Sequence, residues 1–240
     1  MMDPLESHLV GQTSQRPSFW HEVRASAVIE QLPVARSVVV ADVGAGAGLL
    51  GDVVQRDRPM CSYRFYEPLD TLADRLVRRY GDDARMRDAT AVGDADVVTL
   101  LDVLEHIEDD RGFLAGLVSS MRPGAILVLT VPALSFLWSP WDERLGHYRR
   151  YSRPALRAVA NGLPLSVDEL SYLFPELLVP ALVRRVTRGR GRTDGDEHAA
   201  DFPELPRALD RSLRAISGQT YRARHWWPLG TSLLLVAHRD

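Results

Sequence analysis

The sequence contains no lysine: all 29 basic residues among its 240 residues are arginine. This absence excludes chemistry that depends on a lysine amine, including the P-loop lysine, the ATP-binding lysine of protein kinases and a Schiff base with pyridoxal phosphate. The single cysteine, Cys61, excludes an intrachain disulfide and argues against a cysteine-based metal site.

Long apolar runs and a strong net charge are also missing. No run approaches the ~18 apolar residues that a membrane helix needs, and residues 1–17 are polar, without the apolar core of a signal peptide. The formal net charge is −3 and the basic residues are spread along the chain, which does not indicate a nucleic-acid surface. We therefore expect a cytoplasmic protein with no transmembrane segment and no nucleic-acid partner.

The chain does contain enough apolar residues, 45%, to build a sizeable core. Its length fits one domain with a modest insertion. We expect a single domain over residues 1–240, with an N-terminal arm and helix over 1–33 and a cap insertion over about 174–230.

Short apolar runs alternate with helical patterns along the chain. The apolar runs predict strands over residues 38–41, 63–66, 84–87, 97–101, 125–131, 163–173 and 231–238. Apolar residues at helical spacing predict helices over residues 18–32, 49–55, 69–80, 109–121, 152–161 and 205–221. This alternation predicts an α/β fold, a doubly wound and mostly parallel seven-stranded sheet that is Rossmann-like, with an antiparallel last strand and a helical cap.

Four acidic residues each follow a predicted strand directly. They are Asp42, Glu67, Asp88 and Asp102. In a doubly wound sheet, ligands bind outside the carboxyl ends of the strands. A single acid in this position is often only a helix cap or a turn former, but four of them at one edge predict a ligand site.

A glycine-rich loop, Asp-Val-Gly-Ala-Gly-Ala-Gly over residues 42–48, joins the first strand to a helix. Glycines allow the backbone to approach a ligand closely and to adopt positive φ. Both dinucleotides and S-adenosylmethionine bind over such loops, and Gly46, Gly48 and Gly51 also satisfy the dinucleotide pattern. The loop alone therefore leaves both cofactors open.

The surrounding motifs resemble those of class I S-adenosylmethionine-dependent methyltransferases, closest to the small-molecule branch that includes ubiquinone-type O-methyltransferases. The resemblance rests on the glycine loop, on Glu67, on Asp88-Ala89 and on Leu-Asp-Val-Leu-Glu-His-Ile over residues 101–107, with Pro-Gly at 123–124. It covers residues 35–135 well. It also favours S-adenosylmethionine over a dinucleotide, because Asp42 beside the loop would repel a pyrophosphate.

For the methionyl end of the cofactor, the resemblance implies five ligands. Gly44, Gly46 and Gly48 would carry the methionyl group, and Asp42 would hold its ammonium and order the loop. Asp102 would border the methyl group that is transferred.

For the adenosine end, the resemblance implies three further ligands. Glu67 would accept both ribose hydroxyls, a bidentate role that suits a carboxylate. Asp88 would bind the exocyclic amine of adenine, and the amide of Ala89 the adjacent ring nitrogen.

Two histidines are candidates for the general base that a hydroxyl acceptor would need. His106 follows the predicted strand over 97–101, and His147 lies in the loop after the strand over 125–131. Each could equally be a structural residue. Asp102 and His106 by themselves do not make a metal site, so we expect no metal.

The same loop offers candidates for binding the acceptor: Trp138, Trp141, Tyr148, Arg149 and Tyr151. The aromatic rings could wall an apolar acceptor or pin the loop to the body. Arginine could meet an acidic acceptor, although a salt-bridged arginine is the commoner case. Residues 174–186 could touch a membrane or a lipid, but we expect a buried cap helix there.

The sequence therefore predicts methyl transfer from S-adenosylmethionine to a small molecule, with S-adenosylhomocysteine as the product. The acceptor expected from the resemblance is a hydroxyl of a secondary metabolite or of a lipid- or glycan-linked intermediate. Two alternatives stay open: an NAD(P)- or flavin-binding oxidoreductase, and a non-catalytic S-adenosylmethionine-binding protein.

Overall fold

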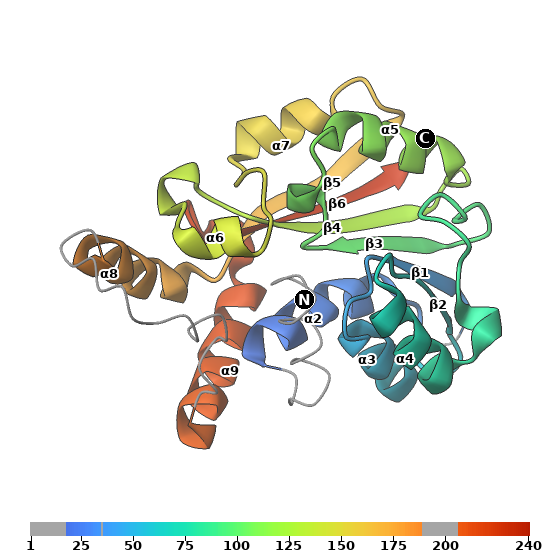
Figure 1. Cartoon of the computed structure of the whole chain (residues 1–240), viewed down its shortest axis with the longest axis horizontal. Helices are drawn as coiled ribbons and strands as arrows, with labels where there is room; N and C mark the ends of the chain where they lie inside the picture. Colours follow the sequence, from blue (N-terminus) through green and yellow to red (C-terminus); the bar gives the residue numbers. More distant parts are fainter. Residues whose placement is uncertain (1–17, 35, 189–205) are drawn as a thin grey trace.

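The computed structural model describes residues 18–34, 36–188 and 206–240, which form one six-stranded sheet with helices on both faces (Figure 1). The strands are β1 (Val39–Val43), β2 (Ser62–Tyr66), β3 (Val97–Leu101), β4 (Ile126–Pro132), β5 (Leu165–Leu173) and β6 (Ser232–Arg239). Their order is β2-β1-β3-β4-β6-β5. Strands β1 to β4 pair in parallel, and β6 runs antiparallel to both of its neighbours. The predicted Rossmann-like sheet with an antiparallel last strand is confirmed.

Helices pack against each face of this sheet. On one face lie α5 (Asp110–Ser120) and α7 (Arg153–Ala160); on the other lie α2 (Phe19–Gln31), α3 (Leu49–Asp57) and α4 (Asp70–Tyr80) (Figure 1). Helix α9 (Arg207–Arg222) packs against α2. Other helical segments are α6 (Pro140–Arg144), α8 (Leu178–Arg188) and the 3-10 turns η1 (Asp82–Ala84), η2 (Leu104–His106), η3 (Ser135–Leu137), η4 (Pro175–Leu177) and η5 (Arg224–Trp226).

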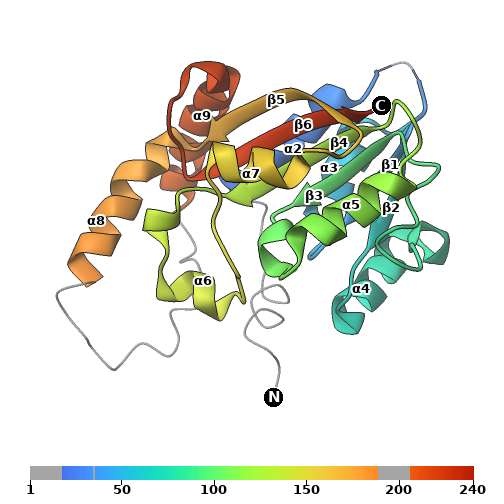
Figure 2. The ribbon, with the colours of Figure 1, turned by 90° about the horizontal axis from the view of Figure 1, so that it is seen from above.

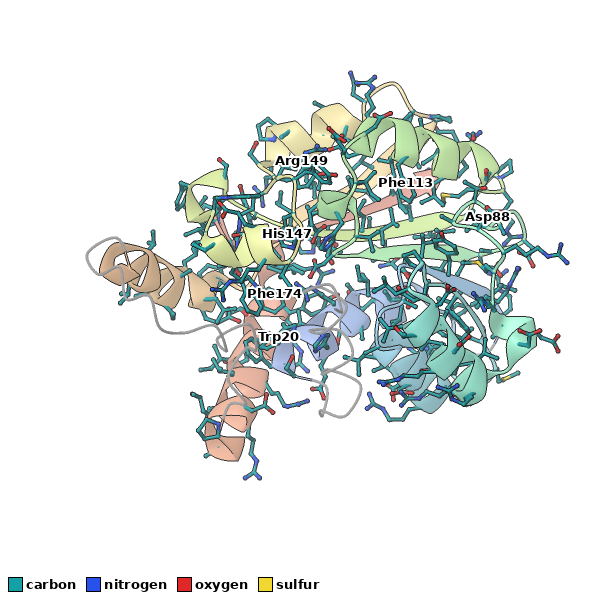
Figure 3. All side chains as sticks on the ribbon, in the orientation of Figure 1. Trp20, Asp88, Phe113, His147, Arg149 and Phe174 are labelled. Atoms are coloured by element: carbon teal, nitrogen blue, oxygen red, sulfur yellow. The ribbon has the colours of Figure 1, made fainter. Side chains whose placement is uncertain are left out.

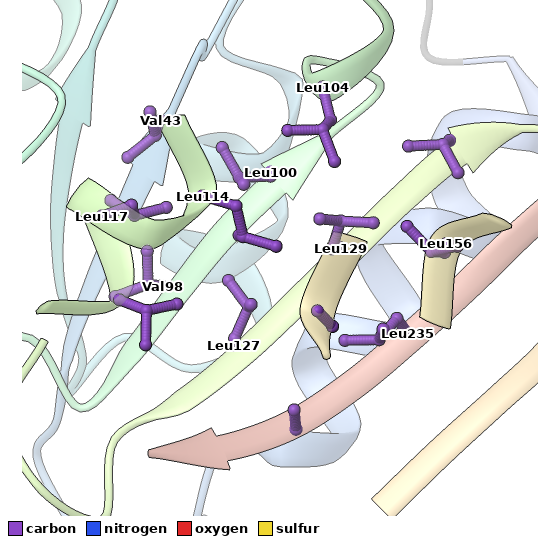
Figure 4. Close-up of a cluster of buried hydrophobic side chains, with 14 of the residues drawn as sticks. Val43, Val98, Leu100, Leu104, Leu114, Leu117, Leu127, Leu129, Leu156 and Leu235 are labelled. Atoms are coloured by element: carbon purple, nitrogen blue, oxygen red, sulfur yellow. The ribbon is translucent and has the colours of Figure 1, made fainter. Parts of the chain in front are cut away.

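The sheet divides the core into two layers. Successive residues of a strand point to opposite faces, so Val98 and Leu100 of β3 pack on the α5 side, whereas Val97 packs on the α2 side. Figure 4 shows Leu114 and Leu117 of α5 over the first of these layers. Both leucines are at most 1% exposed, and truncating a leucine in such a position to alanine costs about 2–5 kcal/mol. This packing fixes the strand ends from which the site is built.

One of the seven predicted strands, the one over residues 84–87, is wrong. Ala84 ends η1, and Arg85 makes an isolated bridge to Phe65 of β2. The segment Ala-Arg-Met-Arg carries two charges and one large apolar side chain, Met86. It therefore has too little apolar surface for a strand that is covered on both faces.

The predicted cap over residues 174–230 separates into different parts in the region that the structure describes. Helix α8 extends away from the sheet, whereas α9 lies along α2 (Figures 1 and 2). Val179, Leu182 and Val183 of α8 are 68%, 41% and 56% exposed. The expectation of a buried cap helix is therefore wrong for this face of α8, because spacing shows which residues share a face but not what covers it.

Two parts of the sequence-based prediction, the arm over 1–17 and residues 189–205 of the cap, lie outside the described residues. Within the described ranges, no helix combines the length and apolarity needed to cross a membrane.

Candidate functional site

The glycine loop follows β1 and leads into α3. Gly44, Gly46 and Gly48 all have positive φ, at 79°, 54° and 76°, a backbone conformation that side chains with a Cβ rarely adopt. Space is also limited, because a Cβ on Gly44 would lie 2.6 Å from Cγ2 of Val103. Glycine is therefore required at Gly44 by both the backbone and the packing.

Asp42, at the end of β1, is buried at 2% exposure. The hydroxyls of Tyr63 on β2 and Thr99 on β3 donate to its two oxygens, each at 2.7 Å. Burial raises the pKa of Asp42, and these two hydrogen bonds oppose that rise. The carboxylate ties three strands together at the base of the loop. That geometry fits the ordering role predicted for Asp42 better than contact with a cofactor ammonium.

Glu67, just after β2, holds the glycine loop directly. The amide of Gly46 donates to its Oε2 at 2.7 Å and the amide of Leu69 to its Oε1 at 2.9 Å. Burial raises the pKa of Glu67 despite these two bonds. The side chain is 6% exposed. Each carboxylate oxygen can accept a second hydrogen bond, so two ribose hydroxyls could still bind there.

Asp88 and Ala89 lie in the turn that replaces the predicted strand. Asp88 is exposed, and the amide and hydroxyl of Thr90 donate to its Oδ1 at 2.8 and 2.6 Å. These bonds, the side-chain one first, lower the pKa of Asp88. Figure 3 shows Asp88 well apart from His147. The structure therefore brings Asp88 to the surface as a turn residue.

Asp102 directly follows β3 and has a left-handed φ of 56°. The Thr130 hydroxyl donates to its Oδ1 at 3.0 Å, and its Oδ2 pairs with Nη2 of Arg24 from α2. The Arg24 guanidinium also lies over the ring of Phe174, 5.8 Å from the centroid. Its Nε is buried and has no hydrogen-bond partner in the described part of the chain. Sequence reasoning missed Arg24, because the helical pattern of α2 marks its apolar face but not which polar side chain turns inward.

The turn η2 places Glu105 and His106 beside His147. The two imidazole rings meet edge to face, 4.7 Å apart between centroids. Glu105 is 1% exposed, and burial together with Asp102 raises its pKa well above the usual range. Burial, and then the nearby His147, lowers the pKa of His106 to about 4. At neutral pH His106 is therefore uncharged, with a ring nitrogen able to accept a hydrogen bond or bind a metal ion.

Asp142 on α6 is a site residue that sequence reasoning missed. It is fully buried, and Nδ1 of His147 lies 3.1 Å from its Oδ1. Arg150 donates to both of its oxygens, at 2.7 and 3.1 Å. Although burial opposes ionisation, the bonds from His147 and Arg150 lower its pKa to about 2. The carboxylate engages Nδ1 of His147 and leaves Nε2 available. The spacing from Asp142 to His147 in an irregular segment gave no periodic signal for this pair.

Two of the predicted acceptor residues are bonded within the protein, and a third is exposed. Tyr151 is buried at 2% exposure, and its hydroxyl donates to Oδ2 of Asp110 at 2.8 Å, so it pins the segment to the body instead of walling a pocket. Arg149 pairs with the same carboxylate at 2.7 Å and donates to backbone oxygens (Figure 3). Tyr148 is 53% exposed.

The two tryptophans of the predicted acceptor wall are both half-buried. Nε1 of Trp138 donates to Oε1 of Glu143 at 3.2 Å, and Trp141 lies in α6. They therefore fit either of the two roles foreseen for them.

A glycine loop between β1 and α3, with acids at the ends of β1, β2 and β3, defines a Rossmann-like domain that binds a nucleotide-containing cofactor at the carboxyl ends of its strands. The family described as a methyltransferase domain matches residues 15–169, which include this loop and these acids. The chain belongs to that family. Methyl transfer with S-adenosylmethionine as the cofactor is the activity of that family.

Solved methyltransferase structures share the fold at low sequence identity. A methyltransferase from Haloferax volcanii, solved with the Trm112 activator, is 15% identical with a TM-score of 0.64, covering 100% of this chain and 99% of that one. An S-adenosylmethionine-dependent methyltransferase from Archaeoglobus fulgidus is 14% identical with a TM-score of 0.55, covering 91% and 94%. Phosphoethanolamine N-methyltransferase 2 from Haemonchus contortus, with S-adenosylmethionine, is 13% identical with a TM-score of 0.57, covering 91% and 52%.

A comparison with curated proteins finds no match. The resemblance to the ubiquinone-type branch therefore stays a prediction, as does the nature of the acceptor.

Proposed function

We propose that this methyltransferase methylates a hydroxyl group of an uncharged small molecule, which sits between the end of β3 and the segment from β4 to α7. One observation carries the proposal: the buried Asp142 holds Nδ1 of His147, whose ring packs against His106 beside Asp102. A carboxylate that orients an imidazole is the usual arrangement for a histidine base.

In the proposed step, the acceptor oxygen attacks the methyl carbon as the carbon–sulfur bond breaks. S-adenosylhomocysteine leaves as a neutral thioether, and the acceptor proton passes to Nε2 of His147. His106 is uncharged at neutral pH and packs edge to face against the His147 ring. Holding the two reactants in line supplies much of the rate, about 7–11 kcal/mol in favourable cases, and a base adds about 10²–10⁴-fold.

The cofactor roles predicted from the resemblance are kept in the proposal, except that Asp42 only orders the loop, and one role is added. Gly44, Gly46 and Gly48 carry the methionyl group, and Glu67 accepts the ribose hydroxyls with its remaining lone pairs. We add Arg24 as the partner of the methionyl carboxylate. Its guanidinium reaches the methyl-donor end of the sheet through Asp102, and its buried Nε still needs an acceptor.

Asp88 and Ala89 keep the adenine in the proposal. Asp88 is exposed, and both hydrogen bonds from Thr90 go to its Oδ1, so its Oδ2 can accept one from the exocyclic amine.

Ion pairs within the protein support an uncharged acceptor. Arg149 is engaged by Asp110 and Arg150 by Asp142, so neither is available for an acidic group without breaking a bond. The exposed ring of Tyr148, with Trp138 and Trp141 nearby in sequence, suits an apolar or glycosyl surface. A secondary metabolite or a lipid- or glycan-linked intermediate fits this description. Contact between residues 174–186 and a lipid surface stays a prediction.

Transfer of a labelled methyl group tests the proposal. The full chain is incubated with S-adenosylmethionine carrying a tritiated methyl group and with separate pools of phenols, sugar derivatives, amines and carboxylic acids. We expect label in a hydroxyl-containing pool, and kcat reduced about 10²–10⁴-fold in His147→Ala, as for loss of a general base. His238→Ala, which removes an exposed histidine paired with Asp168, is the matched control. Label in amines alone would contradict the hydroxyl assignment.

A further inference from the structure

Three side chains with metal-binding atoms converge next to the proposed acceptor position. One ligand atom each from Glu105, His106 and His147 lies within 4.8 Å of the other two. Bonds from a first-row divalent ion to nitrogen and oxygen ligands are about 2.0–2.2 Å long, so two ligands of one ion are at most about 4.4 Å apart. In a tetrahedral site the ligand atoms are about 3.3–3.6 Å from one another, so a contraction of at most about 1.5 Å would bring all three onto one ion.

Two of these three residues each have a buried side-chain atom that could bind an ion and has no partner. Oε2 of Glu105 and Nδ1 of His106 have no hydrogen-bond partner among the residues that the structure describes. Glu105 as a whole is only 1% exposed. A buried polar atom without a partner is destabilising and rare in folded proteins. Two such atoms in one cluster indicate that something absent from the polypeptide binds between them.

The third ligand is already oriented for a metal ion. Asp142 lies 3.1 Å from Nδ1 of His147, which leaves Nε2 as the free ring nitrogen. A carboxylate that bonds the far nitrogen of a histidine is the usual support for a metal-binding imidazole. Asp102, by contrast, is occupied by Arg24 and Thr130, so we leave it out of the ligand set.

We propose that Glu105, His106 and His147 bind one divalent first-row transition-metal ion, and that an open coordination position of this ion takes the acceptor oxygen. Two imidazoles and one carboxylate suit zinc, iron and manganese and leave sites for a further ligand. This inference rests on the proposed function only for the identity of that further ligand.

A bound ion would change how the acceptor hydroxyl is activated. An oxygen ligand of such an ion loses its proton far more readily than in water. His106 and His147 would then act as ligands, and the acceptor proton would pass to solvent before the oxygen attacks the methyl carbon. The ion would activate the acceptor hydroxyl in place of the histidine base. The oxygen–carbon bond that forms and the carbon–sulfur bond that breaks would be the same.

Direct metal titration of the tag-free full chain tests the site, after removal of metals with a chelator and dialysis. Zinc binding is measured by calorimetry, and cobalt binding by its visible absorption, which reports nitrogen and oxygen ligands independently of activity. The variants are His147→Ala, the isosteric Glu105→Gln and Asp142→Asn. His238→Ala is the matched control, since His238 also pairs with an aspartate, at 3.0 Å, but on the exposed part of β6.

We expect one ion per wild-type chain and a loss of affinity of about 100-fold or more in His147→Ala and Glu105→Gln. Asp142→Asn, which removes only the support of His147, should weaken binding about 10–100-fold, and His238→Ala should match the wild type. Circular dichroism confirms that each variant is folded. A wild-type chain that binds neither zinc nor cobalt, or a His147→Ala chain that binds them equally well, would overturn the proposal.

Titration of the same proteins with S-adenosylhomocysteine separates this inference from the proposed function. A chain that binds the cofactor product but no ion overturns the metal site alone. A chain that binds the ion but not the cofactor product overturns the proposed function and leaves the metal site standing.

Discussion

Gly44 illustrates how much a single residue determines at this site. Its φ is 79°, and a Cβ there would lie 2.6 Å from the Val103 side chain. Left-handed backbone costs a residue with a Cβ about 1–2 kcal/mol before any clash. The loop can therefore approach both the cofactor and β3 only with glycine at this position.

We predict that Gly44→Ala lowers the free energy of unfolding by about 1–3 kcal/mol and weakens S-adenosylhomocysteine binding. Gly116→Ala is the control, since Gly116 is an exposed glycine of α5 with open space around its Cβ position. It should raise stability by about 0.5–1 kcal/mol. Urea unfolding and calorimetry measure both. Equal effects of the two substitutions would contradict the account.

Arg24 yields a second prediction at this scale. If its guanidinium binds the methionyl carboxylate, Arg24→Ala should weaken S-adenosylhomocysteine binding by about tenfold or more, as expected for hydrogen bonds to a charged group. Binding of methylthioadenosine, which lacks the amino-acid part, should not change.

Arg153→Ala is the matched control for Arg24. Its Nε is likewise buried without a partner in the described structure, and its guanidinium lies 4.4 Å from the centre of the Tyr172 ring. It should bind both ligands as the wild type does. If Arg24→Ala weakens the two ligands equally, Arg24 is only structural.

The sequence could predict which residues stand at the strand ends but not which atoms they would meet. Asp42 and Glu67 are identifiable from their positions after apolar runs. The hydroxyls that donate to Asp42 belong to Tyr63 and Thr99, which lie on two other strands. Thr99 is 57 residues away from Asp42 in the sequence. Such partners are set by strand order and register, which local patterns do not contain.

At the scale of elements, the predictable segments are those whose apolar residues recur regularly. β3 and β4, which are apolar except for one threonine each, match their predicted ranges closely. The segment from β4 to α7 has no such period, and its short α6 with Asp142 was therefore missed. α8 shows the remaining limit, because a helix was correctly expected in this apolar stretch, whereas its burial was not correct.

The junction of β5 with the turn after α9 provides a pH test. Arg224 donates from Nε and Nη2 to the two oxygens of Glu169 on β5, at 2.6 and 3.0 Å. Although burial opposes ionisation, the bonds from Arg224 and Ser171 lower the pKa of Glu169 below its usual 4.5. A lowered pKa in the folded state means that the ionised form stabilises the fold. This contribution is complete above the unfolded pKa and is lost as pH falls through the folded pKa.

We therefore predict that the stability difference between the wild type and Glu169→Gln is constant from neutral pH down to about pH 5 and shrinks below about pH 4.5. Urea unfolding followed by circular dichroism at a series of pH values measures it. Arg224→Ala should behave oppositely, because a buried Glu169 without its partner favours the protonated form. A difference that persists unchanged to pH 3 would show that the pair contributes nothing through its charge.

At the scale of the whole molecule, the fold gathers most of the proposed site residues at the carboxyl edge of β1 to β4, whereas Asp88 lies apart on the surface. The class of fold was predictable because short apolar strands alternate with amphipathic helices. The number of strands was not predictable, because the strand predicted over residues 84–87 depended on a short charged segment. The acceptor side was least predictable, since it is assembled from η2, α6 and the loop after it, which lie far apart in the sequence.

The central claim is that S-adenosylmethionine binds at this edge, with Glu67 as a ribose ligand. Calorimetric titration of the purified chain with S-adenosylmethionine, S-adenosylhomocysteine and NADH tests it most directly. We predict that both sulfur compounds bind, that NADH does not, and that Glu67→Ala weakens both by about tenfold or more, since a hydrogen bond to a charged group is worth about 1.5–3 kcal/mol. Binding of NADH alone, or sulfur-compound binding that survives unchanged in Glu67→Ala, would contradict the account.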